Sequence, residues 1–209
     1  MRDDFAGDCE SWSHHEDENV SVGCKDGEYR VLFKSTKQQS KHLIYRRSEE
    51  DVSSVTVEAE ATLRAFPNAS ANDLEFHGVA CFISPPNAPA QGYAFFVDPK
   101  RRALAIMKLD ETDKSLAKQG FFIFLAEKRS EAVGGVGEKN RIRGECRATE
   151  DDRIALKMYL EGQQVAAASD AHGFSGFQSF GFFVFSTKAG TDLRYDNFRA
   201  ARLGTADSE

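Results

Sequence analysis

Hydrophobic and polar residues alternate with a period of two along two long stretches of the chain. The segment Ser54–Leu63 carries Val, Ala or Leu at every odd position and Ser, Thr or Glu at every even position. The segment Arg153–Glu161 repeats the pattern, with Ile, Leu or Met at every even position. Successive side chains of a strand point to opposite faces, whereas a helix repeats every 3.6 residues. Both segments are therefore predicted to be strands with one buried face.

Further segments have the composition and length of strands, and turn-forming dipeptides such as Asp26-Gly27 and Glu161-Gly162 lie between several of them. They are Glu28–Lys34, His42–Arg46, Glu75–Ser84, Gly92–Asp98, Ala103–Leu109, Phe121–Ala126, Asn140–Thr149, Gln163–Ser169, Ser179–Ser186 and Thr191–Leu203. One helical turn or two is expected around Asp113–Lys118. Many short strands without helices between them predict an all-β protein, built as a two-sheet antiparallel β-sandwich.

The length of the chain suits one domain. It has 209 residues, and β-sandwiches of roughly 200–250 residues fold as single units. Phe is abundant, with 17 residues, and it fits the half-buried surface of a sheet. We assign residues 1–203 to the sandwich and expect residues 204–209 to form a disordered tail. The segment Glu10–Gly23 has little apolar content and is expected to be a polar loop.

The charge of the chain argues against a nucleic-acid partner. Its 27 Lys and Arg residues are scattered among 33 Asp and Glu residues, and the net charge is -6. Binding to phosphate backbones needs clustered Lys and Arg. No stretch approaches the roughly 18–20 apolar residues that cross a bilayer. The opening residues Met1–Phe5 show no signal-peptide pattern, which fits either a cytoplasmic protein or an extracytoplasmic domain without its leader. The cysteines favour the extracytoplasmic location, as argued below.

A series of short motifs runs in order through the chain and resembles the bacterial concanavalin A-like domains, which are similar to the laminin-G-like and 3-keto-disaccharide hydrolase-type folds. The motifs are Asp3-Asp4-Phe5, Trp12, Asp26-Gly27-Glu28-Tyr29-Arg30, Val55-Thr56-Val57-Glu58-Ala59, Gly78-Val79-Ala80-Cys81, Gly92-Tyr93-Ala94-Phe95, Asn140-Arg141-Ile142-Arg143-Gly144-Glu145-Cys146, Leu156-Lys157-Met158-Tyr159-Leu160-Glu161-Gly162, Asp170, Gly181 and Tyr195-Asp196-Asn197-Phe198. The resemblance spans Asp4 to Leu203. The family's usual Asn-Gly hairpin is Glu161-Gly162 here, and the glycine still supplies the positive φ of the turn.

The resemblance implies a concanavalin A-like jelly roll. Such domains often stand as ectodomains of membrane-anchored or secreted proteins, including some receptor-type kinases. Related sandwiches often hold one structural calcium ion between the first and last strands. Asp4 and Asp196 are the carboxylates at matching positions, and calcium prefers oxygen ligands of this kind. The alternative is that both side chains only cap backbone groups and that the protein has no cofactor.

Four cysteines allow two disulfides in three possible pairings. We favour Cys9–Cys24, because these residues flank the polar segment Glu10–Gly23, which has little apolar content to hold it in place. We also favour Cys81–Cys146, since both lie in predicted strands at positions where the resembling domains tend to carry cysteine. Disulfides persist in oxidising compartments. The alternative is that all four are reduced, with Cys81 and Cys146 acting as small core residues.

Catalytic chemistry has only weak candidates in this sequence. Glycoside hydrolases use two carboxylates that flank the bond they cleave. Glu58 and Glu60 lie on one face of a predicted strand, about 7 Å apart along it. The Glu-x-Asp-x-x-Glu type of signature found in β-glucanases is absent, so a solvated sheet face is the alternative. We therefore expect a binding domain rather than an enzyme.

Sugar binding would use aromatic faces and planar polar side chains on a concave sheet. The residues predicted to form this face are Tyr45, Arg46, His77 and Tyr93. We expect first a non-catalytic domain that binds a carbohydrate or another cell-envelope ligand. A glycoside-directed hydrolase that uses Glu58 and Glu60 and a structural protein-interaction domain are the alternatives. The sequence leaves the ligand and the oligomeric state open.

Overall fold

The computed structural model describes residues 1–6, 9, 11–35, 40–47, 53–68, 70, 72–85, 88–174 and 179–203. Within 40–47 only the side chain of Ile44 is described, and the side chains of residues 118 and 119 are not. The described part is all-β and forms two antiparallel sheets packed as a sandwich, which confirms the predicted fold class. The predicted tail at residues 204–209 lies outside the described residues. No helix in the described part is long and apolar enough for a bilayer span.

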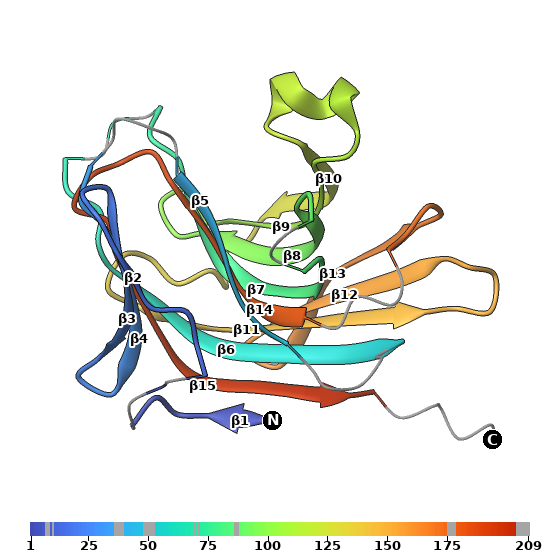
Figure 1. Ribbon diagram of the computed structural model, residues 1–209, viewed down its shortest axis with the longest axis horizontal. Coiled ribbons are helices and arrows are strands. Elements are labelled where there is room, and N and C mark those ends of the chain that lie inside the picture. Colours follow the sequence, from blue (N-terminus) through green and yellow to red (C-terminus); the bar gives the residue numbers. More distant parts are fainter. Residues whose placement is uncertain are drawn as a thin grey trace.

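The larger sheet has nine strands in the described part of the chain. Across the sheet they are β13 (Gln163–Asp170), β12 (Ile154–Leu160), β11 (Lys139–Ala148), β6 (Ser54–Ala65), β15 (Asp192–Arg202), β4 (Glu28–Phe33), β3 (Val20–Lys25) and β2 (His15–Glu16), with β1 (Arg2–Asp3) also paired to β15. In Figure 1, β6 and β15 form the long lower layer, and β2, β3 and β4 continue it at the left.

The smaller sheet has six described strands and packs on the inner face of the larger one (Figure 1). Their order is β10 (Phe122–Arg129), β9 (Ala103–Asp110), β8 (Gln91–Asp98), β7 (Glu75–Ile83), β14 (Ser179–Ser186) and β5 (Ser40–Arg47). The short helical segment expected around residue 113 is a 3-10 helix, η1 (Lys114–Gln119), capped at its start by Asp113.

The structure corrects the sequence prediction for the segment Glu10–Gly23. It was expected to be a loop, but it contains β2 and most of β3. The apolar residues Val20 and Val22 alternate with Ser21 and Gly23, so β3 buries one face against the core and leaves the other open. This alternation spans only four residues in a polar context, and it was therefore overlooked.

The core lies between the sheets, where aromatic side chains pack together and a disulfide joins the two sheets. Trp12 stacks on Phe182 with ring centroids 4.9 Å apart, and its indole N–H donates to Asp3 at 2.8 Å. The predicted disulfide Cys81–Cys146 joins β7 to β11 across the sandwich, with both residues fully buried. Cys9–Cys24 ties the N-terminal segment to β3. Both predicted pairings are therefore present.

The outer face of the six-stranded sheet carries a second apolar cluster. Its members include Ala80, Ile83, Ala94, Phe96, Ala105, Met107, Phe183 and Phe185, all of them buried. Phe122 of β10 reaches over this face, with its ring 6.0 Å from that of Phe183. Most residues of strands β7, β8 and β14 are thus buried on both faces of the sheet.

Two titratable side chains, Glu75 and His77, lie completely buried on β7. Their Oε1 and Nδ1 atoms are 2.8 Å apart, while Oε2 of Glu75 and Nε2 of His77 have no partner within the described part of the structure. Burial raises the pKa of Glu75 above 4.5, the nearby Asp98 raises it further, and His77 opposes the shift. An acid whose pKa is raised by folding holds its proton longer in the folded state than in the unfolded state.

The stability that Glu75 contributes is therefore expected to fall as pH rises from about 4.5, where the unfolded carboxyl ionises, to its higher folded pKa. Chemical denaturation from pH 4 to 8 of the wild type and of Glu75→Gln measures this. The wild type should lose stability relative to the variant over this window, because glutamine has no proton to release. A difference between the two proteins that stays constant with pH would contradict the prediction.

Candidate functional site

A polar hollow of about 570 Å³ opens on the outer face of the nine-stranded sheet, at its β2–β3–β4 edge. Its floor is formed by small or apolar residues, Ser21 and Gly23 of β3 and Leu32 of β4. Ser21 pairs with Leu32 and Gly23 pairs with Arg30 in the strand register, so these side chains share one face. The hollow exists because two successive outward positions of β3 carry almost no side chain.

The hairpin that presents the hollow is fixed by its turn and by a disulfide. Asp26 and Gly27 join β3 to β4 with φ angles of 57° and 77°, as two-residue hairpins of this hand require. The Cys9–Cys24 disulfide holds the preceding segment against β3. His14 lies directly over Gly23, where an added Cβ would be 2.9 Å from its Nδ1 atom. Glycine at this position thus makes room for the imidazole in the wall of the hollow.

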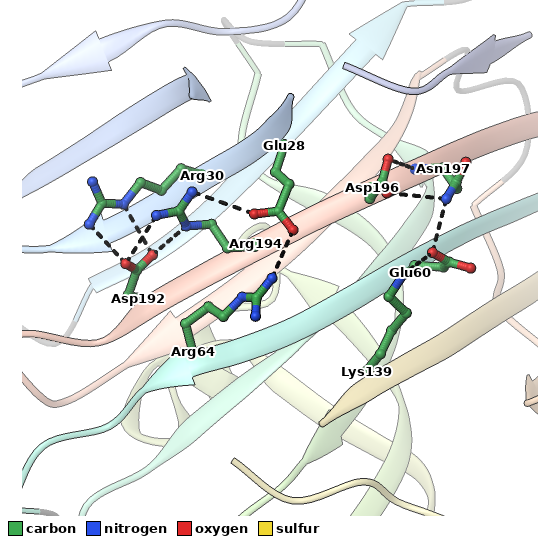
Figure 2. A network of polar contacts seen from close by, with 9 residues as sticks. All are labelled: Glu28, Arg30, Glu60, Arg64, Lys139, Asp192, Arg194, Asp196 and Asn197. Atoms are coloured by element: carbon green, nitrogen blue, oxygen red, sulfur yellow. Dashed lines mark hydrogen bonds and ion pairs between the residues drawn. The ribbon is translucent and has the colours of Figure 1, made fainter. Parts of the chain in front are cut away.

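Arg30 is the most firmly oriented charged side chain in the hollow. Its Nε and Nη2 atoms donate to the two carboxylate oxygens of Asp192 at 3.1 and 2.8 Å. Burial opposes ionisation of Asp192, but hydrogen bonds from Arg194 and Arg30 outweigh it and lower the pKa of this carboxyl below 3.8. In Figure 2 the other terminal nitrogen of Arg30 points away from Asp192. Within the described residues this nitrogen has no hydrogen-bond partner, so its N–H groups are available to a ligand.

The Arg30–Asp192 pair is part of a longer network of ion pairs on the same face (Figure 2). Arg194 also contacts Asp192 at 2.9 Å and Glu28 at 3.6 Å, and Arg64 contacts Glu28 at 3.2 Å. The network crosses β4, β15 and β6. Each guanidinium is held by at least one carboxylate, so the side chains at the inner edge of the hollow are fixed before any ligand arrives.

The opposite wall of the hollow carries a second set of charges. Lys34 pairs with Glu16 at 2.8 Å and also donates to the carbonyl of Asp17 at 3.0 Å. His15 contacts the Asp17 carboxylate at 2.9 Å, and that contact, after a backbone hydrogen bond from Val20, contributes to a lowered Asp17 pKa of about 2. These contacts hold the β2 segment in place beside β3.

The predicted catalytic candidates Glu58 and Glu60 lie on the outer face of β6, and both are engaged by cations. Glu58 accepts two hydrogen bonds from Arg141 at 3.0 and 2.8 Å. Glu60 pairs with Lys139 at 2.6 Å and accepts from Asn197 at 2.9 Å (Figure 2). The hydrogen bond from Lys139 is the largest effect on the pKa of Glu60, and it lowers it. A carboxyl with a lowered pKa is a poor proton donor at neutral pH, so Glu60 does not fit the acid role of a glycosidase.

Two of the four residues predicted to line a binding face lie elsewhere in the structure. His77 and Tyr93 are 0% and 1% exposed and point into the space between the sheets. The hydroxyl of Tyr93 donates to Asp170 at 2.8 Å. The placement expected for these two side chains on an outer, ligand-facing surface is corrected accordingly. Tyr45 and Arg46 lie in β5, opposite Gly181 and Phe180, and their side chains lie outside the described part of the structure.

The predicted calcium ligands lie near the junction of the first and last strands. Asp4 follows β1, which pairs with β15 through Asp3 and Phe198. One oxygen of Asp4 accepts from the backbone N–H of Ala6 at 3.2 Å, and Asp196 accepts from the N–H of Asn197 at 2.7 Å. No group of three or more His, Cys, Asp or Glu side chains that could hold a metal ion occurs in the described residues. Calcium binding here remains a prediction.

A smaller pocket of about 140 Å³ lies on the outer face of the six-stranded sheet. It is lined by aromatic residues that include Phe76, Phe96 and Phe124, with the Asp98–Arg101 ion pair at its border. Phe124 is 48% exposed. The pocket is mostly apolar and a quarter of the size of the polar hollow, and it offers few hydrogen-bonding groups to a polar ligand.

Sequence reasoning did not identify Ser21, Gly23, Lys25 or Arg30, which line the polar hollow, as binding residues. Lys25 and Arg30 flank a turn that was recognised, at Asp26-Gly27. In a hairpin with a two-residue turn, Lys25 is opposite Glu28 and Gly23 is opposite Arg30, as the structure shows. Extending the predicted strand backwards from the turn would therefore have placed Ser21, Gly23 and Arg30 on one face.

Comparisons with known proteins bear on the fold. No family model matches the chain, and no curated protein sequence matches it. Solved structures do match. The carbohydrate-binding module CBM66 from Bacillus subtilis is 18% identical, with a TM-score of 0.59 over 91% of this chain and 94% of that one. The carbohydrate recognition domain of Emp46p, in its potassium-bound form, is 10% identical, with a TM-score of 0.61 over 91% and 88%.

An enzyme is also among the similar structures. A glycoside hydrolase family 16 endo-glucanase from Bacteroides ovatus is 11% identical, with a TM-score of 0.56 over 96% of this chain and 99% of that one. Binding domains and a hydrolase thus share this architecture, and identities this low establish the fold alone. The comparisons therefore support a two-sheet β-sandwich and leave the function to be argued from the surface residues of this chain.

Proposed function

We propose that this chain is a non-catalytic carbohydrate-binding domain and that the polar hollow on β2, β3 and β4 is its binding site. The observation that carries the proposal is the oriented guanidinium of Arg30, fixed by Asp192 on one side and open to the hollow on the other. Sugar hydroxyls need rigid donors and acceptors, and a fixed side chain loses little entropy when it binds them. The floor residue Leu32 offers an apolar surface for a sugar ring.

Three further facts support this function. The chain has the fold of a carbohydrate-binding module and of carbohydrate recognition domains. The volume of the hollow lies in the range of roughly 300–1,000 Å³ that small-molecule sites occupy. The glutamates suggested for catalysis are bound by Arg141 and Lys139, which favours a binding role over hydrolysis. Two disulfides also suit a domain outside the cytoplasm, where carbohydrate ligands are present.

A glycan array followed by titration calorimetry on its best ligand tests the proposal. Arg30→Gln is expected to weaken binding at least about tenfold, because hydrogen bonds to charged groups contribute about 1.5–3 kcal/mol and each 1.4 kcal/mol is tenfold in affinity. Asp192 keeps Arg194 as a partner in this variant, so the fold should persist. Circular dichroism and a thermal melt verify that it does.

Arg64→Gln is the matched control. It removes the same charge from the same network, but Arg64 is 53% exposed and lines no part of the hollow. This variant should bind within about twofold of the wild type, since exposed ion pairs contribute little. A wild-type protein that binds no saccharide on the array, or equal losses in both variants, would overturn the proposed site.

A further inference from the structure

The residues that line the hollow are net positive, whereas the whole chain is net negative. The chain has a net charge of -6. The residues that line the hollow include three permanent cations, Lys25, Arg30 and Lys34, and a single carboxylate, Glu16. His14 and His15 complete the polar wall. A concave surface that is locally positive on an acidic protein concentrates field lines and attracts anions specifically to that place.

The carboxylates of the protein do not neutralise all of this positive charge. Lys34 is matched by Glu16. Among the described residues of the adjoining network, the three guanidiniums of Arg30, Arg64 and Arg194 share two carboxylates, Asp192 and Glu28. This network therefore has one positive charge in excess, and it borders the hollow at Arg30.

Lys25 adds a second uncompensated charge. Its cross-strand neighbour is Glu28, but that carboxylate is already engaged by Arg64 at 3.2 Å and Arg194 at 3.6 Å. Among the described residues Lys25 makes no ion pair. On the outer face it is the diagonal neighbour of Arg30, a relation in which the two residues lie about 7–8 Å apart and their Cβ atoms somewhat closer. Long side chains at that spacing can converge on one anionic group.

We infer that the ligand of this hollow is an acidic saccharide, with a carboxylate or sulfate group held between the free terminal nitrogen of Arg30 and the ammonium group of Lys25. The inference rests on the proposed function and adds the chemical class of the sugar. A planar carboxylate or a sulfate accepts hydrogen bonds from a guanidinium in good geometry. The neutral part of the sugar then lies over Ser21, Gly23 and Leu32.

The test compares pairs of polysaccharides that share one sugar backbone, of which one member is acidic and the other neutral. Polygalacturonate is paired with its methyl ester, and dextran sulfate with dextran, in calorimetry or affinity electrophoresis at about 20 and 200 mM salt. At least one acidic member should bind tenfold or more tightly than its neutral partner and should weaken as salt rises. The carboxylated and sulfated pairs distinguish the two possible anionic groups.

Lys25→Gln should reduce binding of the acidic member at least threefold. Lys157→Gln, on the outward side of β12 in the same sheet, should leave it unchanged and serves as the charge-matched control. Equal losses in the two lysine variants would mean diffuse attraction and would overturn the inference. Neutral and acidic members that bind alike, with binding lost in Arg30→Gln, would overturn the acidic class while the proposed function stands. Binding to no saccharide at all would overturn both.

Discussion

Replacing Cys81 and Cys146 together by alanine is expected to lower the free energy of unfolding by about 4 kcal/mol. The two cysteines are 65 residues apart in sequence, and their disulfide closes a long loop in the unfolded chain. Without the bond, the unfolded chain regains the conformational freedom that the closed loop had removed. Both residues are fully buried between the sheets, so the smaller side chains also lose packing contacts in the folded state.

Urea denaturation of the oxidised proteins measures this loss. The double variant of Cys9 and Cys24 is the control, because its disulfide spans only 15 residues and should contribute about 3 kcal/mol on the same loop-closure argument. The order of the two effects is thus set by loop length. A Cys81/Cys146 variant within 1 kcal/mol of the wild type would show that the bond between the sheets is not a major source of stability.

Asp170→Ala is expected to cost about 3–5 kcal/mol of stability at pH 7. One oxygen of Asp170 receives both the ammonium group of Lys108 and the hydroxyl of Tyr93, each at 2.8 Å. All three residues are less than 10% exposed. Removing the carboxylate leaves the Lys108 charge buried, and its remaining contacts among the described residues are the His172 carbonyl, at 2.8 Å, and the ring of Phe174.

Asp151→Ala is the appropriate control for this change. Asp151 is 68% exposed, and its replacement should change stability by less than about 0.5 kcal/mol. Burial opposes ionisation of Asp170, but hydrogen bonds from Lys108 and Tyr93 outweigh it and lower its pKa below 3.8. Its contribution is therefore present above the unfolded pKa and is lost as pH falls through the folded one. A loss below 1 kcal/mol in Asp170→Ala at pH 7 would contradict the buried-pair argument.

The fold could be predicted well because most strands carry a strong local signal. Alternation over Ser54–Leu63 and Arg153–Glu161 identifies β6 and β12, which have one buried and one solvated face. Cys9–Cys24 was predicted from the polar segment that these residues flank, and Cys81–Cys146 from their positions in predicted strands together with the family resemblance. The strands β2 and β3 were harder, since the first has two residues and the second carries its alternation over one short apolar pair.

The misplacement of His77 and Tyr93 has a physical reason. Strands β7 and β8 are buried on both faces, so the sequence alternation does not show which side of each strand faces the other sheet. The predicted Cys81–Cys146 disulfide could have shown which face of these strands points inward. Cys81 must point inward to reach Cys146, His77 is four residues before it on the same strand, and Tyr93 is its cross-strand partner. All three side chains therefore share the inner face.

The polar hollow could not be predicted from local sequence patterns, because its charged residues come from separate parts of the chain. Arg30 and Asp192 are 162 residues apart in sequence and meet because β4 pairs with β15. No local sequence pattern indicates that β4 pairs with β15. The strand neighbours of β15 are set by the long-range topology of the sheet, which a single sequence does not reveal.

The disulfide between β7 and β11 makes a ring of the middle third of the chain. If the oxidised protein is pulled from its two ends, the residues between Cys81 and Cys146 stay slack and bear no load. At roughly 3.5 Å for each extended residue, this disulfide alone shortens the fully stretched contour of the chain by about 220 Å. Reduction thus changes how far the domain lengthens under tension, independently of any change in its resting shape.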